Sequence, residues 1–151
     1  MSELKRILVV DDDEDIHALL EKTLEQGKHQ LDVESMLEGD LEDMSLDVDL
    51  RTYEIHHTYQ GHEALEKVEA AKKYHYMYDL IFMDLQLPPG IDGVETIKEI
   101  SKTNKNLKFV ICSGFNSYSW EDVQKEVGGM ARLFLLEKPF NIKDIKKIIA
   151  Q

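Results

Sequence analysis

The chain has 151 residues, of which 42% are hydrophobic and 32% charged, the composition of one folded globular domain rather than of a disordered segment. Thirty acidic residues against 18 basic ones leave a formal charge of −12, which argues against direct binding of nucleic acid, since that rests on clustered lysine and arginine. Cys112 is the only cysteine and no run of 18 apolar residues occurs, which excludes internal disulfides and predicts no membrane contact and a reducing, cytoplasmic location.

The first predicted strand, Ile7–Val10, runs directly into five consecutive acidic residues. Apolar residues then recur every three or four positions from Ile16 to Leu24, which predicts an amphipathic helix with the last two acids in its first turn. Asp13 is predicted either to cap this helix or to support a cation through water. Asp11 and Asp12 follow the strand at once, and because neighbouring carboxylates repel each other, either they are simply solvated or a cation belongs beside them.

The segment from Gly27 to Thr52 is far longer than a usual connection between a helix and a strand. Ser35–Glu38 has the pattern of a capping box, and alternating apolar residues on either side of it predict two short strand pieces. Its aspartates lack the spacing and the turn glycine of a calcium-binding loop. We therefore expect an ordered, hairpin-like acidic insertion over residues 27–52, with a solvated surface.

The rest of the chain alternates predicted strands with predicted helices. Apolar or β-branched runs predict strands at Tyr53–Tyr59, Leu80–Met83, Phe109–Cys112 and Leu133–Leu136. Helical periodicity begins after Gly61, Gly93, Ser119 and Asn141. Strands that alternate with helices form right-handed βαβ units, so the sequence predicts an α/β protein with a doubly wound parallel sheet of type (βα)5, as a single domain over residues 1–151.

Polar residues with related chemistry stand where the predicted strands end, and in an open parallel sheet ligands bind beyond the carboxyl ends of the strands. These residues are Asp11, Asp12, Asp84, Ser113 and Lys138. A hard cation such as Mg²⁺ prefers carboxylate oxygens and substrate phosphate as ligands. With this cation present, the Asp84 carboxylate would attack a phosphoryl group, Lys138 would pair with one phosphoryl oxygen, and Ser113 would donate a hydrogen bond to another.

Four motifs at these strand ends resemble those of a response-regulator receiver domain of two-component signalling. They are "ILVVDDDEDI" (Ile7–Ile16), "YDLIFMDLQLPPGIDGVE" (Tyr78–Glu95), "FVICSG" (Phe109–Gly114) and "EKPF" (Glu137–Phe140). One motif alone would be weak evidence of a resemblance, but four in order are strong evidence. Together they cover nearly the whole chain outside the insertion. The resemblance implies a flavodoxin-like sheet with strand order 2-1-3-4-5.

The resemblance also implies roles for individual residues. Asp84 would accept a phosphoryl group from the phosphohistidine of a sensor histidine kinase or phosphotransfer protein. Ser113 would be the switch hydroxyl, and the Lys138–Pro139 peptide bond would be cis. The Mg²⁺ ligands would be Asp11, Asp12, Asp84 and the backbone carbonyl of Gln86.

Such a domain catalyses its own phosphorylation and dephosphorylation but is not otherwise an enzyme. Phosphorylation would switch a surface around the fourth helix and fifth strand that binds an unknown downstream protein. Only 13 residues follow Lys138, so we expect no output domain after the sheet. The chain would then be either a single-domain regulator or a fragment of something larger.

The sequence departs from the family pattern at several points. Leu135 stands where the family has a switch aromatic, and Phe134, one position earlier, would point to the opposite face of its strand. The loop "LPPGIDG" has one extra residue, which could shift its last glycine. The missing aromatic leaves open a pseudo-receiver, a protein-interaction scaffold that does not transfer phosphate. A second alternative is an aspartate-nucleophile phosphatase of haloacid-dehalogenase type, although that family carries its nucleophile on the first strand and Asp84 ends the third.

The remaining reactive side chains are expected to be structural. Cys112 lies inside an apolar run and is predicted to be a buried, unreactive thiol. His56 and His57 would lie on opposite faces of a strand, so they cannot bind one ion together. Structural or solvent-exposed roles are expected for all the histidines: His17, His29, His56, His57, His62 and His75.

Overall fold

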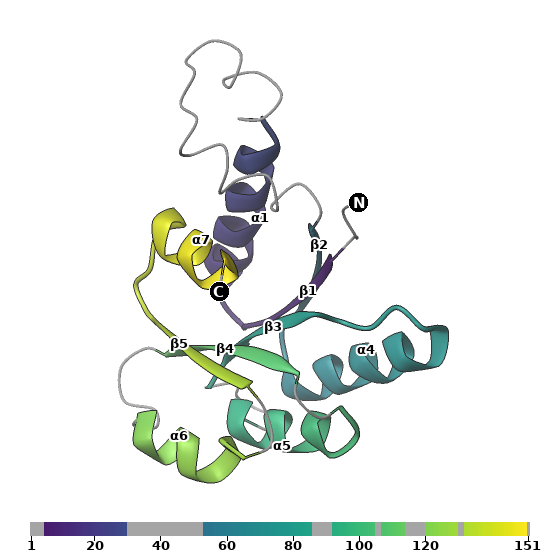
Figure 1. Ribbon diagram of the computed structural model, residues 1–151. Coiled ribbons are helices and arrows are strands. Elements are labelled where there is room, and N and C mark those ends of the chain that lie inside the picture. Colours follow the sequence, from purple (N-terminus) through teal and green to yellow (C-terminus); the bar gives the residue numbers. More distant parts are fainter. Residues whose placement is uncertain are drawn as a thin grey trace.

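The computed structural model of the chain describes residues 5–29, 53–85, 92–104, 107–113, 120–129 and 132–150. Within these ranges, strands and helices alternate along the chain (Figure 1). The strands are β1 (Lys5–Val10), β2 (Tyr53–Thr58), β3 (Leu80–Asp84), β4 (Lys108–Ser113) and β5 (Arg132–Glu137). The helices are α1 (Glu14–His29), α4 (Gly61–Tyr74), α5 (Gly93–Thr103), α6 (Trp120–Val127) and α7 (Ile142–Ala150).

The five strands form one parallel sheet in the order β2-β1-β3-β4-β5. The strand β3 lies near the middle of this sheet, and all five of its residues are buried. At the edge, β2 is only partly buried, which agrees with its more polar sequence. The prediction of a flavodoxin-like, doubly wound (βα)5 sheet with strand order 2-1-3-4-5 is confirmed.

Helices cover both faces of the sheet: α1 and α7 lie on one face, and α4, α5 and α6 on the other (Figure 1). Successive strand residues point to opposite faces, which divides the core into two clusters. On the α1 and α7 side, the strand residues in the core include Ile7, Val9, Phe82, Val110 and Cys112. On the other side they include Leu8, Val10, Ile81, Met83 and Ile111.

Polar side chains fix the starts of three helices. Asp13 precedes α1 and accepts a hydrogen bond from the Asp15 N–H at 2.9 Å, so the predicted capping role of Asp13 is confirmed. Asp92 caps α5 by accepting from the Glu95 N–H at 2.9 Å. The predicted cap of the last helix, Asn141, makes two reciprocal bonds of 3.0 Å that form a capping box with Asp144. Ser119 lies outside the described residues.

The predicted start of the insertion was wrong by three residues, because α1 continues through Gly27 to His29. Glycine weakens a helix by about 1 kcal/mol but does not end one whose earlier turns already pack against the core. The rest of the predicted insertion, residues 30–52, lies outside the described residues. No helix in the described part of the chain has both the length and the apolar character needed to cross a bilayer.

Candidate functional site

Three carboxylates meet at the carboxyl edge of the sheet, where β1 and β3 end. Asp11 and Asp12 follow β1, Asp84 is the last residue of β3, and one oxygen of each lies within 4.8 Å of the others. Asp11 and Asp84 are only 1% and 6% exposed, whereas Asp12 is open to solvent. We call these three residues the acidic corner. Sequence reasoning predicted that they converge, and the structure brings them together.

The position of Asp11 in the acidic corner is fixed by contacts to four of its polar atoms. Its N–H donates to the Thr58 carbonyl at 3.2 Å, and its own carbonyl accepts from His17 Nε2 at 2.8 Å. In the side chain, Oδ1 accepts from the Asp13 N–H at 2.9 Å, and Oδ2 faces the Lys138 ammonium at 3.0 Å. Both the backbone and the carboxylate of Asp11 are therefore fixed relative to β2, α1 and the end of β5.

Lys138 brings a positive charge to the acidic corner from just beyond β5. Its Nζ lies 3.0 Å from Asp11 Oδ2 and 3.6 Å from Asp84 Oδ1, and the Lys138–Pro139 peptide bond is cis, as the resemblance implied. Burial lowers the pKa of the Lys138 ammonium, but the charges of Asp11 and Asp84 and the contact with Asp11 outweigh burial and raise the pKa overall. The lysine therefore stays charged, yet one ammonium cannot neutralise three carboxylates.

A close backbone approach holds the end of β3 against the start of α5. The Gly93 N–H donates to the Leu85 carbonyl at 3.0 Å. A Cβ atom on Gly93 would lie 2.2 Å from the Asp84 carbonyl oxygen, which is inside contact distance. Glycine is thus required here for a steric reason. Sequence reasoning treated Gly93 only as a helix start and as a glycine that the longer loop could displace.

The structure describes the other predicted site residues only in part. Ser113 is the last residue of β4, one position beyond Cys112, which pairs in register with Asp84; the Ser113 side chain lies outside the described atoms. Gln86 also lies outside the described residues. Cys112 itself is buried, and burial raises the pKa of its thiol, as expected for an unreactive cysteine.

The two faces of β5 differ as the sequence predicted. Phe134 packs against the core cluster on the α1 and α7 side, and the Lys108 ammonium lies 4.7 Å from the centre of its ring. Leu133 packs against the cluster on the opposite side. Because side chains alternate along a strand, Leu135 shares the face of Leu133 and not that of Phe134. Phe134 therefore points to the opposite face of β5 from Leu135, as the sequence predicted.

A histidine pair beside the acidic corner was missed by sequence reasoning. His17 on α1 and His57 on β2 contact each other through their Nδ1 atoms at 2.7 Å, and His57 Nε2 contacts Glu21 Oε1 at 2.6 Å. His56 points to the opposite face of β2 and contacts Tyr78, so the prediction that adjacent histidines face apart is confirmed. Forty residues separate His17 from His57 in sequence, and no local pattern links them.

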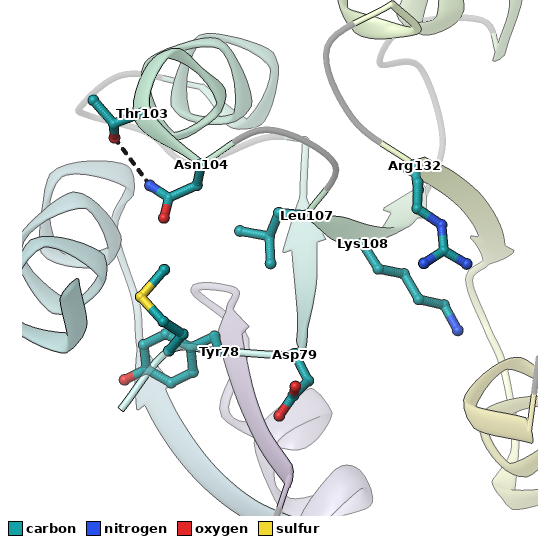
Figure 2. A pocket seen from close by; sticks show the side chains of 8 residues that line it. Tyr78, Asp79, Thr103, Asn104, Leu107, Lys108 and Arg132 are labelled. Carbon is teal, nitrogen blue, oxygen red and sulfur yellow. Dashed lines mark hydrogen bonds between the residues drawn. The ribbon is translucent and has the colours of Figure 1, made fainter. Parts of the chain in front are cut away.

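A separate cavity lies at the opposite, amino edge of the sheet, near the first residues of β3, β4 and β5 (Figure 2). Its volume is about 430 Å³. Tyr78, Asp79, Asn104, Lys108 and Arg132 contribute to its lining (Figure 2). None of the predicted site residues lines it, so the acidic corner remains the candidate functional site.

A parallel sheet in this order, with clustered carboxylates and a lysine at its carboxyl edge, is the arrangement that the resemblance to receiver domains implies. The family model of the response regulator receiver domain matches residues 41–150. This match covers well over half of the chain, so the chain belongs to the response regulator receiver domain family of two-component signalling. Receiver domains in this family are signalling domains that interact with histidine kinases and typically bind Mg²⁺ through acidic residues.

Curated proteins match part of this chain. The chain is 25% identical over 92 residues to sporulation initiation phosphotransferase F of Bacillus subtilis (strain 168), a match that covers 61% of this chain and 69% of the relative. It is 32% identical over 95 residues to the uncharacterized transcriptional regulatory protein YesN of the same organism, covering 60% of this chain and 23% of the relative. The chain thus spans less than a quarter of YesN.

Solved structures show the same fold. A CheY-like receiver domain protein from Methanospirillum hungatei JF-1 superposes with a TM-score of 0.63 at 24% identity, over 97% of this chain and 91% of the other. A chain from the complex of histidine kinase ThkA with response regulator protein TrrA superposes with a TM-score of 0.63 at 28% identity, over 96% of this chain and 95% of the other.

Proposed function

We propose that this receiver domain accepts a phosphoryl group on Asp84 in a Mg²⁺-dependent reaction. The donor is the phosphohistidine of a sensor histidine kinase or of a phosphotransfer protein. The observation that carries this proposal is the Lys138 ammonium 3.6 Å from Asp84 Oδ1 within the acidic corner. This lysine would pair with a phosphoryl oxygen once the group is on Asp84.

The residues of the acidic corner fit a hard divalent cation. All of the side-chain donors are carboxylate oxygens, and two of the three carboxylates are buried, so their mutual repulsion is poorly screened by water. Asp11, Asp12 and Asp84 would hold Mg²⁺, together with the backbone carbonyl of Gln86. When bound, Mg²⁺ would neutralise the carboxylates and the negative charge of the incoming phosphoryl group.

The chain's own residues would then position the transfer. A carboxylate oxygen of Asp84 attacks phosphorus, the phosphorus–nitrogen bond of the donor breaks, and its electron pair goes to the imidazole nitrogen, which takes a proton. The Lys138 ammonium pairs with one phosphoryl oxygen, and Ser113 at the end of β4 donates a hydrogen bond to another. Such a reaction depends on positioning and charge neutralisation more than on a strong base.

Phosphorylation would act through a changed binding surface. We propose that it draws Ser113 toward the phosphoryl group and shifts α6 and β5 between two arrangements that a downstream protein distinguishes. The absence of an aromatic side chain at Leu135 makes this coupling differ in detail from the family's usual switch. The domain would act in the cytoplasm and regulate only its own phosphorylation state, with no direct contact with nucleic acid or membrane.

The two alternatives are less well supported. A pseudo-receiver scaffold has no need for Lys138 to contact both Asp11 and Asp84, and these contacts are present. An aspartate-nucleophile phosphatase would carry its nucleophile on β1, whereas Asp84, the proposed phosphoacceptor, ends β3, the central strand of the sheet. Neither alternative accounts for the full set of site residues.

The test is phosphorylation without a kinase. The protein is incubated with acetyl phosphate and either Mg²⁺ or a chelator, and the mass of the intact protein is measured. We expect the wild type to gain one phosphoryl group only with Mg²⁺, and the Asp84→Asn variant to gain none. Asp79→Asn, which changes a carboxylate at the opposite end of the same strand, serves as the control and should be phosphorylated normally. A wild type that gains no phosphoryl mass would refute the proposal.

A further inference from the structure

A continuous chain of hydrogen-bonding contacts joins the backbone of Asp11 to the surface of α1. The Asp11 carbonyl accepts from His17 Nε2 at 2.8 Å, and His17 Nδ1 contacts His57 Nδ1 at 2.7 Å. His57 Nε2 in turn contacts Glu21 Oε1 at 2.6 Å. This series of hydrogen-bonding contacts therefore runs from the end of β1 to α1, then to β2, and back to α1.

The chemistry of the contacts fixes the direction of the first hydrogen bond. A carbonyl oxygen can only accept, so His17 Nε2 must carry the hydrogen that it shares with Asp11. The His17 side chain is polar and almost fully buried, with only 3% of its surface exposed. The ring of Tyr59 packs beside it with the ring centres 4.3 Å apart, so the imidazole is held from two sides. Removal of its donor would leave the buried Asp11 carbonyl without this partner.

We propose that His17 is a positioning residue for the Mg²⁺ site, with His57 and Glu21 holding its ring in place. His17 touches neither a phosphoryl group nor the cation and acts through Asp11. By fixing the Asp11 carbonyl, it fixes the turn of the backbone from which the Asp11 and Asp12 side chains project. Loss of a hydrogen bond that orients a metal-binding residue commonly lowers metal affinity by about 10- to 100-fold. This inference rests on the proposed function, since it takes Asp11 as a ligand of Mg²⁺.

Two conservative substitutions separate positioning from packing. In His17→Gln, the amide nitrogen can take the place of Nε2, so the donor to the Asp11 carbonyl is kept and the contact with His57 is lost. In His17→Asn, the shorter amide can take the place of Nδ1, so the contact with His57 is kept and the donor to Asp11 is lost. Both variants lose the imidazole ring, and because asparagine is smaller than glutamine and forms helices less readily, the melting temperature of each variant in chelator is measured beside its Mg²⁺ affinity.

The experiment measures the Mg²⁺ dissociation constant of the unphosphorylated protein by isothermal titration calorimetry, without any phosphodonor. We expect His17→Asn to raise this constant by about 10-fold or more, and His17→Gln to stay within about threefold of the wild type. His57→Gln should give an intermediate increase, because it loosens the ring of His17 without removing the donor. The melting temperature in chelator reports separately how each substitution affects folding.

His56→Gln is the matched control, since it replaces the neighbouring histidine on β2 whose contacts are with Tyr78 and Glu54 on the other face. It should leave Mg²⁺ affinity unchanged. Equal affinities of His17→Asn and His17→Gln would overturn the inference, while the proposed function would stand. If His17→Asn does not fold, a Mg²⁺ affinity of His57→Gln equal to that of the wild type would overturn the inference. If the wild type binds no Mg²⁺, both the inference and the metal dependence of the proposed function fail.

Discussion

At the scale of the residue, the Lys138 ammonium lies beside two carboxylates that are almost fully buried, those of Asp11 and Asp84. Asp11 is 1% exposed and the side chain of Lys138 22%, so their contact at 3.0 Å is screened much less than a surface ion pair. The Lys138 ammonium also lies near Asp84, which makes it a shared partner of two buried carboxylates. Loss of one partner from such a group leaves charges buried without compensation.

We therefore expect Lys138→Met to lower the free energy of unfolding by about 2 kcal/mol without Mg²⁺, less than the roughly 3–5 kcal/mol for a fully buried pair because Lys138 is partly exposed. The pKa of Lys138 is raised in the folded state, so its stabilisation is fully present below the ordinary lysine pKa and is lost as the pH rises through the folded-state pKa. The difference between variant and wild type should shrink at strongly alkaline pH. Urea unfolding at several pH values measures this difference in the free energy of unfolding. Lys67→Met, at an exposed position on α4, is the control, and an equal effect there would contradict the prediction.

At the scale of the element, the first turn of α5 packs directly on the last residues of β3. Gly93→Ala would place a methyl group 2.2 Å from the Asp84 carbonyl, so the helix and the strand end must separate. We expect a loss of about 1–3 kcal/mol in the free energy of unfolding, measured by urea denaturation. Gly129→Ala is the control, because its added Cβ meets no atom within 4 Å. If Gly93→Ala were as stable as Gly129→Ala, the close approach would be refuted.

Local patterns predicted most of the elements and much of the site. Apolar runs such as Ile7–Val10 predicted the buried strands because side chains on both faces meet helices, and polar caps such as Asn141 predicted helix starts because they bond the free N–H groups. The positions of Asp11, Asp84 and Lys138 followed from the rule that parallel strands end at one edge.

Features that depend on packing between distant segments were not predictable in this way. The contact of His17 with His57 depends on how α1 lies across β2, and the need for glycine at position 93 depends on where α5 meets β3. The end of α1 was also missed, because a glycine within a helix looks like a stop when the packing of earlier turns is unknown.

At the scale of the whole molecule, the chain has a formal charge of −12, and part of this charge is concentrated in the acidic corner. Binding of a cation to the folded state alone stabilises it, by about 2.7 kcal/mol at a concentration 100-fold above the dissociation constant. We expect Mg²⁺ to raise the melting temperature above that in Na⁺ at equal ionic strength. Asp12→Asn, which changes an exposed carboxylate of the site, should remove most of this difference. A Mg²⁺ effect that survives in the variant would indicate general screening of the net charge.

The central claim is that Asp84 receives the phosphoryl group, and locating that group in the chain tests it most directly. The protein is phosphorylated with acetyl phosphate and Mg²⁺, reduced with borohydride to convert an acyl phosphate into a stable alcohol, digested and sequenced by tandem mass spectrometry. We predict that the reduced residue is at position 84 and that the signal disappears in Asp84→Asn. A phosphoryl group found on another residue, or none in a folded wild type that binds Mg²⁺, would contradict the account.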